Sequence, residues 1–275
     1  MEVLYGLHPV EEAVRSGARR LDCVLLARER GDARLERLAR LCRDASVRVT
    51  LESRDQLTRM SRTDAHQGAV ALVRERAFLT IEDLLAPQPA TKNSDISSEE
   101  TRPAHRFFLA LDGIEDPHNL GALLRTADGA GVDGVLLPER RSAPVSATVA
   151  KTSAGASEHV RIARVTNLVR ALEQMKQANV WVLGLDERGT PDYTAFDFRT
   201  DCVLVLGREG AGLHDLVKKT CDHLLRIPMA GAVSSLNVSV AGAVVMYEAM
   251  RQRSQPAQPA TKPDAPAKPR KGLGS

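Results

Sequence analysis

Aromatic residues, long apolar runs and a signal-peptide pattern are scarce or missing in this 275-residue sequence. Phe, Trp and Tyr together make up 3% of the residues, which argues against RNA recognition by a row of surface aromatics that stack on bases. No segment reaches the roughly 18 to 20 apolar residues that a membrane-spanning helix needs. Residues 1–12 carry acids and no apolar core of a signal peptide. We therefore expect a cytoplasmic protein without a membrane partner.

The four cysteines are too scattered to form a metal site or a disulfide framework. Cys23, Cys42, Cys202 and Cys221 include no C-x-x-C pair and no grouping with histidine, whereas zinc sites use closely spaced ligands of these types. We expect buried free thiols in a reducing compartment and no bound metal.

Charge is unevenly distributed although its net value is small. A net charge of +3 does not by itself identify a nucleic-acid-binding protein. Every cation in residues 1–75 is an arginine, and the planar guanidinium suits phosphate oxygens. Glu and Asp are interspersed among these arginines, so a solvated helix surface or a codon bias explains the pattern equally well. Recognition of RNA by shape and phosphate contacts stays open.

The pattern of apolar residues divides the chain into four parts. Residues 1–75 mix helical and strand periodicity and predict a compact α/β module. Residues 76–105 are predicted to be a flexible linker, because the stretch 86–103 is polar, bears prolines and lacks periodicity. Residues 106–253 form the second module, and residues 254–275 a basic Pro/Ala/Lys tail that we expect to be disordered.

Strands and helices alternate through the second module, which predicts a mostly parallel sheet flanked by helices. In such sheets ligands bind beyond the carboxyl ends of the strands. The loops after Leu111, Leu206 and Ile227 are therefore the candidate ligand sites. The predicted strands are 107–111, 135–137, 180–185, 202–206 and 224–227, and the predicted helices are 119–130, 145–154, 168–177, 213–220 and 238–251.

The common nucleotide-binding signatures are absent. No G-x-G-x-x-G follows a predicted strand and opens a helix, and no G-x-x-x-x-G-K-[ST] occurs, which argues against a dehydrogenase or a Rossmann-type methyltransferase. Instead, Gly207, Gly210 and Gly212 follow a predicted strand with the spacing G-x-x-G-x-G. Glycine lets backbone groups approach a ligand closely, although a tight turn explains the same pattern.

Polar residues also stand at the start of two predicted helices. Asn119 is expected at a helix N-cap, where its side chain would satisfy free backbone N–H groups. Arg125 follows in the same helix among leucines and alanines, where a charge needs a partner. A structural ion pair is the alternative to a functional role. Ser235 and Asn237 precede the last helix, and ordinary capping explains them as well.

Together the three loops resemble the signature motifs of the SpoU (TrmH) family of RNA ribose 2′-O-methyltransferases, in the SPOUT superfamily. The sequence reads N-x-G-x-x-x-R-T-A over 119–127, L-G-x-E-G-x-G over 206–212 and I-P-M-x-G-x-x-x-S-L-N-V-S-V-A over 227–241, in the family's order. The leading module resembles the L30e-like RNA-binding domain of many members. Segments 5–13 and 66–70 are similar to the version in bacterial members that methylate a guanosine of 23S rRNA.

The resemblance implies an α/β fold with a SPOUT-type trefoil knot in the mostly parallel sheet, preceded by the small L30e-like domain. Periodicity does not reveal a knot, because connections in most folds do not thread one another. The resemblance also implies a homodimer with catalytic sites near the interface, S-adenosyl-L-methionine as cofactor, and 23S rRNA as the RNA partner. The final helix, with Val240, Val244, Val245 and Met246, would make the dimer contact or be a core helix.

The family's residue roles carry over position by position. The resemblance implies that Arg125 is catalytic. Because a free guanidinium, with a pKa above about 12, is a very poor base, we favour positioning and electrostatic stabilisation. Asn119 and Asn237 would orient Arg125, the RNA or the cofactor, while Glu209 and Ser235 would hold loops and charges in place or be structural. The implied cofactor-binding residues are Leu206, Gly207, Gly210, Ile227, Met229, Leu236 and Asn237.

Two other functions stay open. The same chemistry on transfer RNA is the nearest, because the transfer-RNA members share the catalytic motifs but typically lack the leading domain. A non-catalytic RNA-binding or ribosome-assembly protein is the other. The second alternative is disfavoured by the intact motif residues Asn119, Arg125, Glu209, Ser235 and Asn237.

Overall fold

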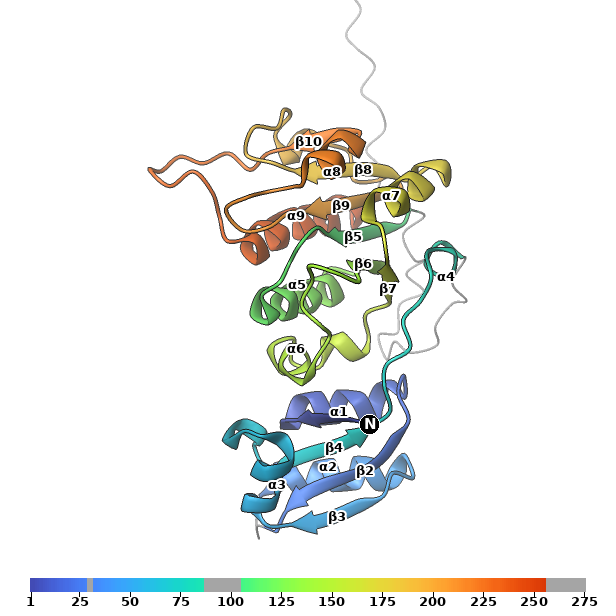
Figure 1. Ribbon diagram of the computed structural model, residues 1–275, viewed down its shortest axis with the longest axis vertical. Helices are drawn as coiled ribbons and strands as arrows, with labels where there is room; N and C mark the ends of the chain where they lie inside the picture. The colour runs from blue at the N-terminus through green and yellow to red at the C-terminus, as the bar shows by residue number, and fades with distance from the viewer. Residues whose placement is uncertain (29–31, 87–104, 256–275) are drawn as a thin grey trace, which may run out of the picture.

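The computed structural model describes residues 1–28, 32–86 and 105–255, which build two sheets (Figure 1). A four-stranded sheet lies at one end of the molecule and a six-stranded sheet at the other. No helix in these described ranges is long and apolar enough to cross a membrane.

The first sheet has the order β1-β4-β2-β3, with β4 antiparallel to both of its neighbours and β3 parallel to β2. Helix α2 begins where the Asp32 side chain accepts from the backbone N–H of Arg34. An apolar cluster joins the helices to the sheet, which confirms the predicted small α/β module. The elements are β1 (Glu2–Tyr5), α1 (Leu7–Ser16), β2 (Leu21–Ala27), α2 (Ala33–Asp44), β3 (Val49–Glu52), α3 (Arg54–Ser61), the 3-10 helix η1 (Asp64–His66) and β4 (Ala69–Val73).

Residues 76–86 form a defined segment where the sequence pattern predicted the start of a linker. Thr80 and Asp83 build a reciprocal capping box for the short helix α4 (Ile81–Leu85). The apolar residues of α4 are buried against the second sheet and α7. Burial of apolar side chains and a capped N-terminus therefore stabilise this helix, although the sequence that follows it is polar. Residues 87–104 of the predicted linker and residues 256–275 of the predicted tail lie outside the described residues.

The second sheet has the order β10-β8-β9-β5-β6-β7, and every strand is parallel to its neighbours. This arrangement confirms the predicted parallel sheet. The central strands β5 and β9 are buried along their whole length, which is why both appear as continuous apolar runs. The strands are β5 (Phe107–Leu111), β6 (Gly134–Pro138), β7 (Ile162–Val165), β8 (Trp181–Leu185), β9 (Cys202–Leu206) and β10 (His223–Leu225).

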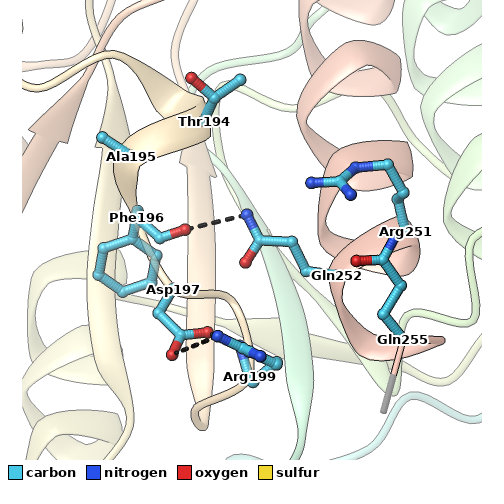
Figure 2. Close-up of a pocket in the computed structure, with 8 residues that line it drawn as sticks. All are labelled: Thr194, Ala195, Phe196, Asp197, Arg199, Arg251, Gln252 and Gln255. Carbon is cyan, nitrogen blue, oxygen red and sulfur yellow. Dashed lines mark hydrogen bonds and ion pairs between the residues drawn. The ribbon is translucent and has the colours of Figure 1, made fainter. Parts of the chain in front are cut away.

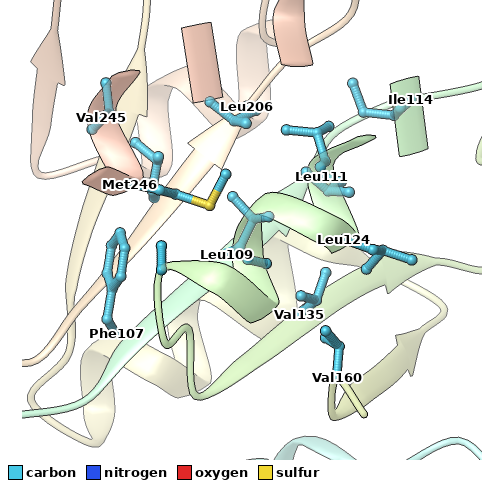
Figure 3. Packing of buried hydrophobic residues seen from close by; sticks show 14 of the residues in the cluster. Phe107, Leu109, Leu111, Ile114, Leu124, Val135, Val160, Leu206, Val245 and Met246 are labelled. Carbon is cyan, nitrogen blue, oxygen red and sulfur yellow. The ribbon is translucent and has the colours of Figure 1, made fainter. Parts of the chain in front are cut away.

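Helices cover both faces of this sheet. Helices α5 and α9 pack together on one face, and α4, α7 and α8 pack on the other. In the core beside α9, Leu109, Leu206 and Met246 gather (Figure 3). The described helical elements of this part are α5 (Pro117–Gly129), α6 (Ala147–Thr152), η2 (Ala156–Glu158), α7 (Leu168–Gln177), η3 (Tyr193–Ala195), α8 (Asp215–Thr220) and α9 (Val238–Arg253).

Helix α5 begins earlier than predicted, and its N-cap is Asp116 instead of Asn119. The Asp116 carboxylate accepts from the backbone N–H groups of His118 (3.0 Å) and Asn119 (3.3 Å). Pro117 suits the first helical position, because its fixed φ matches the helix and its missing N–H would be unpaired there. The side chain of Asn119 is consequently free to contact other loops.

A buried polar contact joins the two modules. Arg19 Nε lies 2.8 Å from Glu158 Oε2, and these side chains are 1% and 0% exposed. Ala150 of α6 packs into the apolar cluster of the first module, and His159 Nε2 lies 2.7 Å from Glu12 Oε2. The first module is thereby held against α6 and η2, as the position of α1 beneath α6 in Figure 1 shows.

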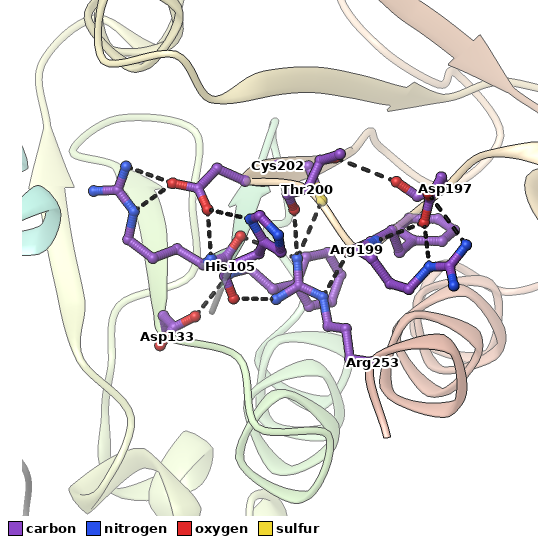
Figure 4. A network of polar contacts seen from close by, with 11 residues as sticks. His105, Asp133, Asp197, Arg199, Thr200, Cys202 and Arg253 are labelled. Atoms are coloured by element: carbon purple, nitrogen blue, oxygen red, sulfur yellow. Dashed lines mark hydrogen bonds and ion pairs between the residues drawn. The ribbon is translucent and has the colours of Figure 1, made fainter. Parts of the chain in front are cut away.

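The carboxyl end of α9 is anchored at the amino edge of the second sheet (Figure 4). Arg253 donates to the backbone carbonyls of Phe198 (2.8 Å), Thr200 (2.7 Å) and His105 (2.7 Å). This anchor leaves the opposite end of α9, with Asn237 as its N-cap, at the carboxyl edge of the strands. Ligands of parallel sheets bind at that edge.

Candidate functional site

Three loops meet at the carboxyl edge of the second sheet, after β5, β9 and β10. Asn119 Nδ2 donates to Glu209 Oε2 (3.2 Å), and Asn237 Nδ2 donates to Asn119 Oδ1 (3.1 Å) and to Glu209 Oε1 (3.3 Å). The structure thus brings together one predicted site residue from each of the three motifs. We call Asn119, Glu209 and Asn237 the polar cluster.

The orientation of Asn237 follows from its position at the start of α9. Its Oδ1 accepts from the backbone N–H of Ser239 (2.9 Å) and from the Ser239 hydroxyl (2.6 Å). The helix cap therefore occupies the amide oxygen and turns the amide nitrogen toward the other two loops. The capping predicted for Asn237 is thus confirmed, and the same residue also joins the three motifs; its role toward Arg125, the RNA or the cofactor stays a prediction.

Asp112 ties the first loop to the second. This residue follows β5 directly and is 5% exposed. Its carboxylate accepts from the backbone N–H of His214 (2.7 Å) and lies 2.8 Å from the ring Nδ1 of the same residue. Because His214 is the N-cap of α8, the contact fixes where the glycine-rich loop ends.

A cavity of about 390 Å³ lies among the loops after β8, β9 and β10, within the usual size range of small-molecule sites. Predicted catalytic residues Glu209 and Ser235 line it, whereas Asn119 and Arg125 do not. The predicted cofactor residues that line it are Leu206, Gly207, Gly210, Ile227, Met229 and Leu236. Asn237 is not part of the lining and reaches the site through the polar cluster.

The glycine-rich turn is folded so tightly that its first glycine has no room for a side chain. A Cβ placed on Gly207 would lie 2.2 Å from the carbonyl carbon of Gly212. Gly210 and Gly212 have φ angles of 74° and 66° and face open space. Backbone groups of the turn can therefore approach a ligand without an intervening side chain. This cradle, beside the apolar Leu206 and Ile227, fits an adenosyl cofactor.

The loop after β8 forms a wall of the cavity that the sequence analysis did not single out. Asp186 Oδ2 accepts from Lys218 Nζ (2.7 Å), and Asp186 Oδ1 accepts from the backbone N–H of Arg188 (2.9 Å). Burial raises the pKa of Asp186, but these hydrogen bonds and the charges of Lys218 and Arg188 outweigh it, so the pKa lies below its ordinary value. The available signal was an acid directly after a buried strand, as at Asp112.

Arg125 is exposed on α5 and forms no hydrogen bond or ion pair with any residue in the described ranges. The structural ion pair that would explain it is therefore not found in the described part of the chain. Ser235 is also exposed, and its side chain makes no hydrogen bond to another described residue. Both side chains are available for contacts with a ligand.

A second hollow lies at the other end of α9, near η3 (Figure 2). Several of its polar side chains already have partners: Gln252 Nε2 donates to the Phe196 carbonyl (3.1 Å), and Arg199 Nε lies 2.8 Å from Asp197 Oδ1. It belongs to the amino edge of the sheet, away from the three loops. None of the predicted site residues lines it.

The cysteines are free thiols, and Cys23, Cys42 and Cys202 are buried. Burial raises the pKa of Cys202 and of Cys221 to about 12, so neither thiol is poised to act as a nucleophile. Within residues 1–28, 32–86 and 105–255, no group of three or more His, Cys, Asp or Glu side chains is arranged to hold a metal ion.

Comparison with known sequences gives a consistent set of relatives. The model described as the SpoU rRNA Methylase family matches residues 106–247, and the model described as RNA 2'-O ribose methyltransferase substrate binding matches residues 3–79. The 23S rRNA (guanosine-2'-O-)-methyltransferase RlmB of Ralstonia nicotianae is 40% identical over 254 residues, 92% of this chain and 96% of the relative. RlmB of Escherichia coli is 39% identical over 255 residues, 92% and 99% of the two chains.

A solved structure shares the architecture. The crystal structure of the SpoU methyltransferase AviRb from Streptomyces viridochromogenes, in complex with the cofactor AdoMet, is 26% identical and covers 91% of this chain and 90% of its own, with a TM-score of 0.71. The matched family model spans more than half of the sequence, and the RlmB relatives align over nearly their whole length. The chain belongs to the SpoU family of S-adenosylmethionine-dependent RNA 2′-O-ribose methyltransferases.

Proposed function

We propose that this chain methylates the ribose 2′-hydroxyl of a guanosine in 23S rRNA. The observation that carries the proposal is the meeting of Asn119, Glu209 and Asn237 beside a glycine-lined cavity. The substrate follows from the RlmB relatives, whose similarity to this chain extends through both modules.

The cavity is the proposed cofactor site. Leu206, Ile227, Met229 and Leu236 offer apolar surface for the adenosyl part, and the turn from Gly207 offers backbone polar groups. When bound, S-adenosyl-L-methionine supplies an electrophilic methyl group on its sulfonium. The side chains around it then have to orient the acceptor and exclude water.

The 2′-hydroxyl is almost wholly protonated near neutral pH, so the protein must hold its oxygen in line with the methyl group and ease loss of the proton. Alignment contributes several kcal/mol, because effective molarities of oriented groups reach about 10⁵ M and above. Assistance with the proton adds about 10² to 10⁴-fold. Arg125 is exposed and has no ion-pair or hydrogen-bond partner among the described residues, so its donors are available to hold the hydroxyl and a neighbouring phosphate. Asn119 and Asn237 orient the reacting groups, and Glu209 fixes both amides.

The first module, residues 1–75, would select the RNA, and residues 106–253 would carry the reaction. Arg40 and Arg43 of α2 are exposed and form no ion pair with a described residue, so they are available for phosphates. Arg19 and Glu158 hold the module in a defined position relative to the site. A fixed spacing between module and site would let one RNA shape, instead of a base sequence, determine the target.

The active form would be a homodimer that uses α9. Val240, Tyr247 and Met250 are 48%, 51% and 42% exposed, and water-exposed apolar patches commonly mark interfaces. Val245 and Met246, in contrast, are buried in the core, so α9 is a core helix on one side, and its exposed side is the proposed dimer contact. A second copy on this face would lie near Arg125, since α5 packs beside α9. The trefoil knot and the cytoplasmic location stay predictions from the family resemblance.

The direct test is methyl transfer by the full chain. Purified protein with methyl-labelled S-adenosyl-L-methionine should label one guanosine of unmethylated 23S rRNA, mapped as a 2′-O-methyl group. Label in transfer RNA and not in 23S rRNA would overturn the substrate assignment. Cofactor and RNA binding without any transfer would overturn the catalytic assignment in favour of an RNA-binding protein.

A further inference from the structure

The acid after β8 lies between two of the motif loops. In the order β10-β8-β9, the strand β8 is flanked by the two strands whose following loops carry the second and third motifs. Asp186 is the first residue after β8, and it lines the cavity together with Lys218 of α8. Side chains at the carboxyl ends of parallel strands face the ligand. Topology therefore places the Asp186 carboxylate at the cofactor.

The position of this carboxylate is set before any ligand binds. The Asp186 backbone N–H donates to the Leu225 carbonyl (2.9 Å), and a Cβ on Gly189 would lie 2.5 Å from the Leu224 carbonyl oxygen. The loop is thus packed closely on β10. The Asp186 side chain is 12% exposed and the Lys218 side chain 33% exposed, and such preorganisation lowers the ordering cost of binding.

The hydrogen bonds already made leave Asp186 with two free acceptor positions. A carboxylate offers about four such positions, two on each oxygen. Lys218 uses one on Oδ2, and the backbone N–H of Arg188 uses one on Oδ1. One position remains on each oxygen, a pattern that matches two hydroxyls on adjacent carbons. The ammonium of Lys218 neutralises the carboxylate and would repel a second cation, so neutral hydroxyl donors suit the site better than the ammonium of the cofactor.

We propose that Asp186, held by Lys218, accepts hydrogen bonds from the two ribose hydroxyls of S-adenosyl-L-methionine. This inference rests on the placement of the cofactor in the cavity proposed above. It makes Asp186 a cofactor-recognition residue and Lys218 a positioning residue for it. In the unrelated dinucleotide-binding fold, an Asp or Glu side chain also accepts a hydrogen bond from a ribose hydroxyl. That contact is a physical precedent for the one proposed here.

Calorimetry on the full chain tests the contact without measuring activity. The ligands are S-adenosylhomocysteine and its 2′-deoxy and 3′-deoxy ribose analogues, and the variants are Asp186→Asn and Lys218→Met. Asp192→Asn is the matched control, because Asp192 lies in the same loop and pairs with Arg226 (2.6 Å) outside the cavity lining. The native chain should bind the deoxy analogues about 10 to 100-fold more weakly than the parent ligand.

Asp186→Asn should weaken binding of the parent ligand about 10 to 100-fold and shrink the penalty for the deoxy analogues, whereas Asp192→Asn should change neither. Lys218→Met keeps the Asp186 carboxylate, so the penalty for the deoxy analogues should persist in this variant. Its affinity for the parent ligand should fall less than that of Asp186→Asn. An unchanged penalty in Asp186→Asn would overturn the inference, as would equal binding of all three ligands by the native chain. If the native chain binds none of the ligands, the proposed function itself fails.

Discussion

Two pairs of polar residues, one pair in each module, differ in burial and in the role that we assign to them. In the first, His66 and Arg19 are 1% and 5% exposed and serve the fold, Arg19 by pairing with Glu158 across the module boundary. In the second, Glu209 is exposed in the loop after β9, and Arg125 is exposed on α5. A buried polar group must keep its partner, because leaving it unpaired is costly. An exposed group can exchange partners for a ligand, so we expect the chemistry to belong to the exposed set.

The largest effect should come from the exposed set. Arg125→Ala should lower kcat for methyl transfer by about 10³-fold, because the guanidinium has no partner in the described chain and its donors are free for the substrate. Methyl incorporation measures the loss. Calorimetry with S-adenosylhomocysteine and thermal unfolding should show native affinity and stability.

The matched control for this variant is Arg170→Ala, which removes another exposed arginine, on α7. It should leave kcat unchanged. If Arg125→Ala instead unfolds the protein or abolishes cofactor binding, then Arg125 has a structural role. The proposed division between exposed catalytic residues and buried structural residues would then be wrong.

Next in size is a backbone effect at the cavity. Gly207→Ala should weaken S-adenosylhomocysteine binding by at least about 100-fold, because its Cβ would lie 2.2 Å and 2.4 Å from the backbone of Gly212 and Leu213, which cannot move without opening the turn. Gly231→Ala is the control, since a Cβ there meets nothing within 4 Å. Equal binding by the two variants would show that the turn does not shape the cofactor site.

Substitutions in the buried set should lower the free energy of unfolding and leave cofactor binding unchanged. Glu158→Gln should lower the free energy of unfolding by about 1 to 3 kcal/mol, because the buried Arg19 then keeps only one carboxylate partner, Glu2. Asp192→Asn, which removes an exposed ion pair, should cost less than about 1 kcal/mol. Urea unfolding measures both. A loss of cofactor affinity in Glu158→Gln without a loss of stability would contradict the division of roles.

The smallest effect concerns the thiols. With a pKa of about 12, Cys221 carries about one thiolate in ten thousand molecules at pH 8, and Cys42, whose pKa is raised to about 11 by burial, is also protonated. Alkylation by iodoacetamide at pH 8 should leave methyl transfer nearly unchanged over an hour. Rapid inactivation, prevented by the cofactor, would instead place a thiol in the site.

Prediction from sequence worked where a feature repeats along the chain or depends on a single segment. Continuous apolar runs identified β5 and β9 because both faces of a central parallel strand are buried. Motif spacing identified Asn119, Glu209 and Asn237, which the structure joins by hydrogen bonds. The N-cap of α5 was predicted three residues too late, at Asn119. Several polar residues near this point can each cap a helix, and the structure uses Asp116, the one followed by proline.

Asp186 and the segment 76–86 escaped prediction for another reason. The local signal at Asp186 is only an acid directly after a buried strand, which ordinary polar turns share, and its proposed role comes from strand order, which places β8 between β9 and β10. The helix α4 within 76–86 is too short to stand out by periodicity, and it exists because the second sheet buries its apolar side. Both depend on neighbours that are distant in the chain.

The amino-acid sequence alone determined the α/β class, the parallel sheet and the loops that carry the motifs, because periodicity and spacing are local properties. Only the tertiary structure decided which polar groups are buried and paired, as Arg19 is, and which stay exposed with no partner in the described part of the chain, as Arg125 does. The physical reason is that burial depends on what the rest of the chain brings to a residue, and the energetics of a charge depend on that burial.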